Sequence, residues 1–266
     1  MHLVEPRGAP RGVLVVAHGL NQHAFGLRSL FEPLAAEGHT IVVLELRGHG
    51  REPNAPPPDA RAVWPEVTVD DWAADWTEAA TVAGEMARRL GVPLAFLGYS
   101  MGALVHVHQM GTRASLPATF ARQVLLAPAI RVRSRTHAVR LFRLLGPRFL
   151  VPSFAPARIR AQDTTSVAAY EALFTMEATI DRLPYPERLQ LPTTVITDPG
   201  DELVSVPRMQ ALVRQYGLED HWTFEAVTKD RATAQTRLRH YITDPAGLGT
   251  AAFDRLLARV REGLFA

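Results

Sequence analysis

Residues 98–102 of this chain read Gly-Tyr-Ser-Met-Gly, and no other stretch constrains the fold as strongly. The apolar residues 92–97 before this stretch are typical of a buried strand, and apolar residues at helical spacing follow from Ala103 onward. A strand that reverses sharply into a helix strains the backbone at the turn and exposes the side chain there. Flanking glycines remove the Cβ atoms that would clash. We therefore interpret Ser100 as a candidate nucleophile, the alternative being a turn without chemistry.

The composition favours a single globular domain with an insertion. The chain has 266 residues, of which 47% are hydrophobic and 21% charged, and this length suffices for one well-buried core. A net charge of +2 is too small to indicate a nucleic-acid surface. The absence of cysteine excludes disulfides, thiolate metal sites and a cysteine nucleophile. We therefore expect no cofactor, no metal and no nucleic-acid partner.

The amino-terminal residues 1–7 lack the apolar segment of a secretory signal. No stretch of the sequence stays apolar over the length that spans a membrane. On this basis we expect a cytoplasmic protein.

Continuous apolar runs alternate with stretches of helical periodicity, which favours an α/β fold with a mostly parallel sheet. Strands are expected at residues 13–17, 40–46, 92–97, 123–127, 193–197 and 222–227. A long helix is expected after Thr68, because Thr68 and Asp71 form a capping box and the apolar residues beyond them step by three and four. A proline-rich loop, residues 47–65, precedes this helix.

Residues 131–190 differ in character from the rest, because they contain no run typical of a buried strand. A basic and apolar helical segment ends at Gly146, and a second helix is expected from about Ser166 to Asp181. We expect a helical lid here, inserted into a core made of residues 1–130 and 191–266.

A serine nucleophile needs an imidazole to take its proton and a carboxylate to orient that imidazole. In a sheet of this kind, both groups are expected on loops at the carboxyl ends of strands. Asp201, which follows the strand at 193–197, is the preferred acid. Asp198 lies closer to that strand and is an alternative, although it also suits a turn, and Glu202 is a weaker one.

Ten histidines compete for the role of base. His240 follows the last expected strand and precedes the closing helix, which gives the chain order Ser, Asp, His. His221 lies at the opposite end of that strand, and His106 and His108 share the helix that follows Ser100. His240 is therefore the preferred base, and a solvated loop histidine is the alternative.

The oxyanion of a tetrahedral intermediate needs hydrogen-bond donors. The backbone amides of Met101, next to the serine, and of Leu20, which follows His18-Gly19 at the end of the first buried strand, are the natural pair.

At this point the sequence resembles the α/β-hydrolase superfamily, and within it the monoacylglycerol lipase and lysophospholipase-like serine hydrolases. The likeness covers almost the whole chain and is carried by His18-Gly19, Arg47-Gly48-His49-Gly50, the turn at Ser100, the expected lid, Asp201-Glu202-Leu203-Val204 and His240. The resemblance implies an α/β-hydrolase fold with about seven strands. It also implies Ser100, Asp201 and His240 as the triad and Leu20 with Met101 as the oxyanion hole.

Three features depart from the family's pattern. Only Leu3-Val4-Glu5 is available for the family's opening hairpin, so its first strand is expected to be missing. Asp198 stands where the family usually has a glycine, three residues before the acid, which keeps Asp198 as an alternative. No glycine immediately precedes His240, so its loop is expected to be built differently.

The leading hypothesis is a cofactor-independent serine hydrolase that acts on small carboxylic esters with apolar acyl groups. The same fold hosts peptidases and thioesterases, and a low-turnover binding protein is a further alternative. Apolar lid residues, Leu141, Phe142 and Leu145 among them, are expected to line an acyl pocket, unless they only pack the lid onto the core. The arginines of the same segment, Arg140 and Arg143, indicate transient contact with a membrane surface or lipid.

Overall fold

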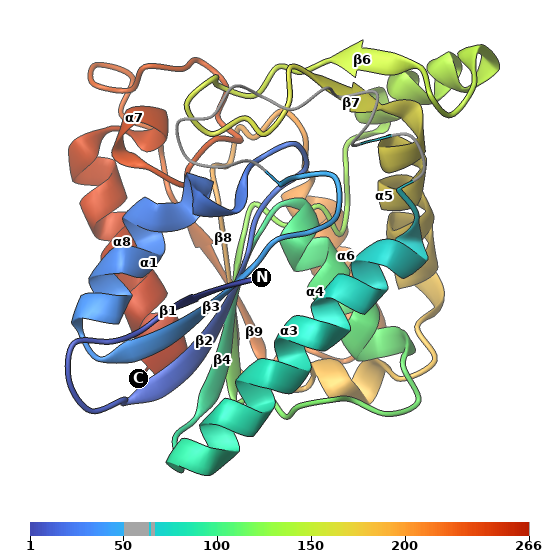
Figure 1. Cartoon of the computed structure of the whole chain (residues 1–266). Coiled ribbons are helices and arrows are strands. Elements are labelled where there is room, and N and C mark those ends of the chain that lie inside the picture. Colours follow the sequence, from blue (N-terminus) through green and yellow to red (C-terminus); the bar gives the residue numbers. More distant parts are fainter. Residues whose placement is uncertain (51–63, 65–66, 266) are drawn as a thin grey trace.

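A seven-stranded sheet lies at the centre of the computed structural model, which describes residues 1–50, 64 and 67–265 (Figure 1). Its strands are β1 (His2–Val4), β2 (Gly12–Ala17), β3 (His39–Leu44), β4 (Leu94–Tyr99), β5 (Arg122–Leu126), β8 (Thr193–Thr197) and β9 (Trp222–Ala226). The spatial order is β1-β3-β2-β4-β5-β8-β9, and every neighbouring pair is parallel except β1 with β3. The predicted α/β class and the six strands predicted from apolar runs are confirmed.

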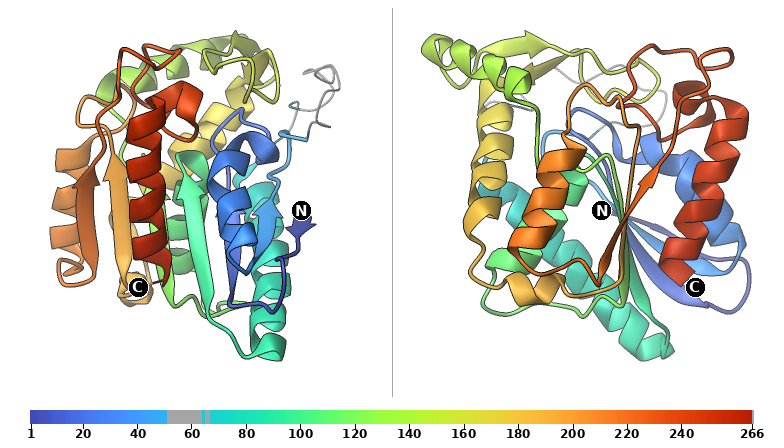
Figure 2. Two further views of the ribbon diagram at one scale, coloured as in Figure 1. Left: turned by 90° about the vertical axis from the view of Figure 1, so that its left-hand side faces the viewer. Right: turned by 180° about the vertical axis from the view of Figure 1, so that it is seen from behind.

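Helices cover both faces of this sheet. Their bounds are η1 (Ala24–Leu27), α1 (Arg28–Ala36), α3 (Val69–Leu90), α4 (Met101–Thr112), η2 (Ser134–Leu145), α5 (Val167–Thr179), η3 (Ile180–Arg182), η4 (Pro186–Leu189), α6 (Val206–Gln215), α7 (Pro245–Leu248) and α8 (Thr250–Phe265). α1 and α8 pack on one face, and α3, α4 and α6 lie on the other (Figures 1 and 2). With both faces covered, every residue of β2, β3 and β4 is buried, which explains why these strands read as continuous apolar runs.

The ends of α3 follow from local sequence chemistry. Thr68 accepts a hydrogen bond from the Asp71 amide and Asp71 accepts one from the Thr68 amide, so the predicted capping box is present. Gly91 ends the helix with a φ of 66°, a left-handed conformation that suits glycine. The proline-rich loop predicted before α3 lies outside the described residues, except for residues 47–50 and the buried Trp64.

The amino-terminal residues form a single short strand at the edge of the sheet. β1 pairs with β3 in antiparallel register, with Leu3 opposite Val42. The sheet of the described chain therefore opens with one edge strand beside β3. The strand expected at Leu3-Val4-Glu5 is thus present one residue earlier, at His2–Val4.

The first part of the segment between β5 and β8 lies at the carboxyl ends of the strands, at the top of Figure 1, and α5 then runs down beside α4. The segment holds η2 and α5, joined by an antiparallel ribbon of β6 (Leu150–Pro152) and β7 (Thr164–Ser166). The expected helical insertion therefore also contains two short strands that the sequence analysis did not predict. Each is only three residues long, too short for an alternating pattern, and their pairing depends on a contact between separate parts of the insertion.

Side-chain contacts fix the part of the insertion after β6 onto the core. The Asn21 amide nitrogen donates to the Gln162 carbonyl at 2.8 Å, and the Gln162 amide donates back to Asn21 Oδ1 at 2.8 Å. Arg158 binds Asp244 through two hydrogen bonds of 2.9 and 2.8 Å. In the described part of the chain, no helix combines the length and the apolar character needed to cross a membrane.

Buried histidines form part of the core. Trp76 Nε1 donates to His106 Nδ1 at 3.1 Å, and the His106 ring stacks on Phe96. The His49 ring lies between His18 and Trp64. Burial lowers the pKa of His106 to about 3 and that of His49 to about 4, so both are neutral in the native protein near pH 7.

These histidines should make the fold sensitive to mild acid. As pH falls below about 6.5, the unfolded chain binds protons at both histidines, whereas the native chain does not bind them until pH approaches 4 or less. Each histidine should therefore lower the free energy of unfolding by about 1.4 kcal/mol per pH unit in this window. Urea unfolding between pH 7.5 and 5 measures the slope. His106→Leu should flatten it, although the unpaired Trp76 N–H lowers absolute stability; an unchanged slope would contradict the prediction.

Candidate active site

Ser100 sits at the junction of β4 and α4, in the turn that the glycine pattern predicts. Its backbone has a φ of 51° and a ψ of −113°, which is strained for a residue other than glycine. A Cβ at Gly98 would lie 2.8 Å from Ala103 Cα, and a Cβ at Gly102 would lie 2.6 Å from the carbonyl oxygen of Ala17. Both positions therefore need glycine, because the helix must begin close to the strand ends.

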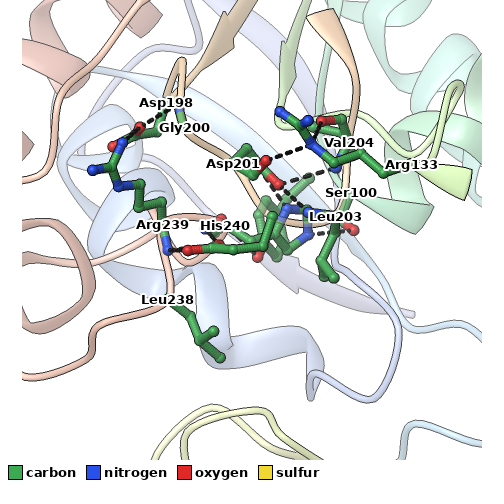
Figure 3. Close-up of polar contacts among 12 residues, drawn as sticks. Ser100, Arg133, Asp198, Gly200, Asp201, Leu203, Val204, Leu238, Arg239 and His240 are labelled. Carbon is green, nitrogen blue, oxygen red and sulfur yellow. Dashed lines mark hydrogen bonds and ion pairs between the residues drawn. The ribbon is translucent and has the colours of Figure 1, made fainter. Parts of the chain in front are cut away.

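A continuous chain of hydrogen bonds joins Ser100 to two residues that are distant in sequence (Figure 3). His240 Nε2 lies 2.9 Å from Ser100 Oγ, and His240 Nδ1 lies 2.8 Å from Asp201 Oδ2. An ionised carboxylate can only accept, so Nδ1 carries the proton and Nε2 is free to accept the serine hydroxyl. The side chains of His240 and Asp201 are 5% and 1% exposed.

The turn after β8 holds Asp201 as an anion. Its second oxygen, Oδ1, accepts hydrogen bonds from the amides of Leu203 at 2.7 Å and Val204 at 3.0 Å. Burial alone would raise the pKa of Asp201, but the charge of His240 and these hydrogen bonds outweigh it and lower the pKa. Arg133 Nε also donates to the Asp201 carbonyl at 2.8 Å, which ties the turn to the chain beyond β5.

Asp198, the alternative acid, has a different set of partners. Its side chain accepts from the amide of Gly200 at 2.8 Å and from the amide of Lys229 at 3.1 Å, and lies 3.5 Å from Arg239 Nη1 (Figure 3). The backbone amide of Asp201 donates to the backbone carbonyl of Asp198. The structure therefore brings Asp201 to the imidazole and uses Asp198 to shape the turn.

The two predicted oxyanion donors flank the serine. Met101 is the first residue of α4, a position whose N–H has no acceptor within the helix. Leu20 lines the cavity at Ser100 and follows Gly19, where a Cβ would lie 2.8 Å from the Tyr99 ring.

His18 supports the loop that carries Leu20. The Leu46 amide donates to His18 Nε2 at 3.1 Å, so the ring proton is on Nδ1, which lies 2.9 Å from the Gly19 carbonyl. Burial, together with the neighbouring His49, holds the pKa of His18 well below its usual value. A neutral imidazole with both nitrogens engaged is a structural link between β3 and this loop.

Ser100 and His240 open into an apolar cavity of about 350 Å³. The insertion supplies much of its wall, including Val139, Val151, Phe154, Tyr170, Leu173 and Phe174. Of the expected substrate-binding residues, Leu141, Phe142 and Leu145 are not part of this wall, and their exposures are 73%, 38% and 59%. The expectation that these three residues line the pocket is thus wrong, and α5 contributes Tyr170, Leu173 and Phe174 to the cavity wall instead.

The sequence contained a signal for the residues of α5 that line the cavity. Tyr170, Leu173 and Phe174 share helical spacing in α5, and they face the sheet domain. In η2, Val139 reaches the cavity, whereas Leu141, Leu144 and Leu145 are exposed, and none of its residues is fully buried. Periodicity alone shows that a helix has an apolar face, but not which neighbour covers it. Among the described residues, no group of three or more His, Cys, Asp or Glu side chains could hold a metal ion.

The family described as Serine aminopeptidase, S33 matches residues 8–181. The chain belongs to this family. Over 174 residues it is 29% identical to a monoacylglycerol lipase of Mycolicibacterium smegmatis, an alignment that covers 63% of this chain and 57% of that relative. The chain thus spans little more than half the length of the relative it matches.

Solved structures share the fold of this family member. A soluble variant of monoglyceride lipase from Saccharomyces cerevisiae has a TM-score of 0.77 at 12% identity, and the match covers 99% of this chain and 90% of that one. The monoacylglycerol lipase of Paleococcus ferrophilus has a TM-score of 0.65 at 16% identity and covers 98% of both chains. The α/β-hydrolase fold predicted from the sequence is confirmed.

Asp201 and Asp198 have different hydrogen-bond partners, so replacing each with asparagine should affect kcat and stability differently. Asp201→Asn should lower kcat by about 10⁴, because the carboxylate that fixes the imidazole tautomer is lost. Asp198→Asn should lower kcat far less and mainly lower the melting temperature, since Asp198 contacts the turn, Lys229 and Arg239 but not the imidazole. Steady-state ester hydrolysis and thermal unfolding of both variants measure these effects. The reverse ranking in kcat would transfer the role of the acid to Asp198.

Proposed function

We propose that this protein is a serine hydrolase that cleaves carboxylic esters with an apolar acyl group. The observation that carries the proposal is the hydrogen-bonded series Ser100, His240 and Asp201, which opens directly into the apolar cavity. The similarity to monoacylglycerol lipases supports a lipase-type substrate.

In the proposed reaction, His240 Nε2 takes the proton from Ser100 Oγ as this oxygen attacks the ester carbonyl carbon. The amides of Leu20 and Met101 donate to the oxyanion of the tetrahedral intermediate. The protonated His240 then gives its proton to the alkoxide leaving group, which departs as an alcohol and leaves an acyl group on Ser100. Water, deprotonated by His240, attacks this acyl-enzyme and releases the carboxylic acid. Asp201 stabilises the imidazolium in both halves of the reaction.

The cavity favours an ester over the peptide substrate that the family description suggests. An aminopeptidase must bind a free α-ammonium group, and such a cation needs an unpaired anion at the site. Glu202 is the one carboxylate among the described residues that line the cavity. Its oxygens already accept hydrogen bonds from the amides of Arg239 and His240.

We also propose that residues 131–190 act as a lid that contacts an anionic lipid surface transiently. η2 exposes Leu141, Leu144 and Leu145, and it carries Arg140 and Arg143 beside them. Exposed leucines interleaved with arginines suit the boundary between acyl chains and negatively charged head groups.

The first experiment tests the nucleophile. Ser100→Ala should lower kcat by about 10⁶ and leave the melting temperature near that of the wild type, because the triad residues act as a unit. A fluorophosphonate probe should label the wild type and not this variant, as followed by intact-protein mass spectrometry. Ser115→Ala, in the exposed loop after α4, is the matched control. Labelling that persists in Ser100→Ala would place the nucleophile elsewhere.

A second experiment separates the cavity wall from the outer face of η2. Leu173→Trp narrows the cavity and should shorten the preferred acyl chain, since each excluded methylene forfeits up to about 0.8 kcal/mol of burial. The double variant Leu144→Ser/Leu145→Ser should reduce flotation with anionic vesicles and leave the chain-length optimum unchanged. Activity on p-nitrophenyl esters of graded length and vesicle flotation are measured for both proteins. A shifted optimum in the double variant would return η2 to the acyl pocket.

A further inference from the structure

His240 lies on a segment without regular secondary structure. No helix or strand is present between β9 and α7, so no ladder of backbone hydrogen bonds fixes residues 227–240. The imidazole must nevertheless reach Ser100 Oγ and Asp201 Oδ2 at 2.9 and 2.8 Å at the same time. Backbone groups elsewhere in the protein bind the amides of residues 227, 230 and 235. Close to His240, in residues 236–240, side chains bind the backbone instead, and two of them, Glu202 and Lys229, are charged.

Glu202 binds the amide side of the segment. The backbone N–H of Arg239 donates to Glu202 Oε2 at 2.9 Å and to Oε1 at 3.1 Å. The backbone N–H of His240 donates to Oε2 at 3.3 Å. Glu202 directly follows Asp201, so adjacent carboxylates contact the same histidine. Asp201 orients the ring and Glu202 holds the main chain from which the ring projects.

Lys229, the only lysine of the chain, binds the carbonyl side of the segment. Its ammonium donates to the carbonyls of Thr236, at 3.3 Å, and Leu238. Lys229 is only 6% exposed. Burial lowers its pKa, and the charges of Glu202 and Asp198 oppose this effect. Burying an ammonium group costs free energy unless its N–H groups are hydrogen-bonded. The carbonyls of Thr236 and Leu238 supply acceptors for it, and in return the ammonium holds this part of the backbone.

Arg239, the residue before His240, also contacts the turn after β8 through its side chain. Arg239 Nη1 lies 3.5 Å from Asp198 Oδ1, and a Cβ at Gly200 would collide with the same guanidinium (Figure 3). Two residues of the turn after β8, Asp198 and Glu202, therefore contact the segment just before and at His240. Arg239 stands immediately before His240, where the resemblance leads one to expect a glycine, and its side chain and amide both contact the turn after β8.

We propose that Glu202 and Lys229 are positioning residues that fix the main chain of His240 for proton transfer with Ser100. The inference rests on the proposed function, because positioning matters only if His240 is the base. Neither residue transfers a proton itself. A displacement of about 1 Å at a reacting group can cost about 10² in rate, so loss of either contact should appear in catalysis.

A series at Glu202 tests the amide side. Glu202→Ala should lower kcat by about 10² with KM unchanged, because substrate still binds the same cavity. Glu202→Gln should fall between Glu202→Ala and the wild type, since its amide oxygen still accepts from one N–H. Glu219→Ala, which removes the same charge from an exposed turn beyond α6, should match the wild type. Thermal unfolding of each variant accompanies the kinetics.

The rate of phosphonylation by diisopropyl fluorophosphate is a second readout. This small reagent reacts with an activated serine without filling an acyl pocket. Its rate should fall in parallel with kcat in Glu202→Ala and in Lys229→Met, and Lys229→Arg should restore part of the loss in the latter. A purely structural role would lower the melting temperature and leave this rate unchanged in the folded variants.

The outcomes separate this inference from the proposed function. A wild type that the reagent does not modify at Ser100 would overturn the proposed function itself. Modification of Glu202→Ala at the wild-type rate, with Ser100 reactive, would overturn the positioning role alone. An increase in KM at unchanged kcat would instead assign Glu202 to substrate contact. The Glu202 series decides the matter even if Lys229→Met does not fold.

Discussion

The close approach of α4 to the end of β2 determines the geometry of the whole site. Gly102 lies so near the carbonyls of Ala17 and His18 that any Cβ would overlap them. This contact holds Ser100 in its strained conformation and places the first amide of α4 beside the loop of Leu20. One packing contact between a strand and a helix therefore positions both Ser100 and the Met101 amide, and the strands around it are fully buried.

Asp201 and His240 lie on segments without regular secondary structure, and charged side chains bind the backbone of both segments. The turn after β8 is shaped by Asp198 and tied by Arg133 to the chain beyond β5. The segment of His240 is bound by Glu202 on its amides and by Lys229 on its carbonyls. Backbone groups without a ladder partner must be satisfied in some other way, and the half-buried Glu202 and the buried Lys229 provide strong ionic partners.

The insertion has two sides with different physical roles. α5 contributes Leu173 and Phe174 to the cavity, and the chain near Gln162 and Arg158 is fixed to the core by paired hydrogen bonds. η2 has no buried residue and turns its leucines to the surface. Apolar side chains of one inserted segment thus divide between the cavity at Ser100 and an exposed outer surface.

The sequence by itself determined the features that local chemistry encodes. Apolar runs and helical periodicity specify the strands and helices, the glycines at 98 and 102 specify the turn at Ser100, and chain order indicates which strand ends carry Asp201 and His240. Tertiary structure decided which of two nearby aspartates meets the imidazole, which face of the insertion lines the cavity, and that β6 pairs with β7. It also decided that Glu202 and Lys229 meet the loop of His240. Each of these depends on contacts between segments that are separate in the chain, and no local pattern of residues reports the distance between such segments.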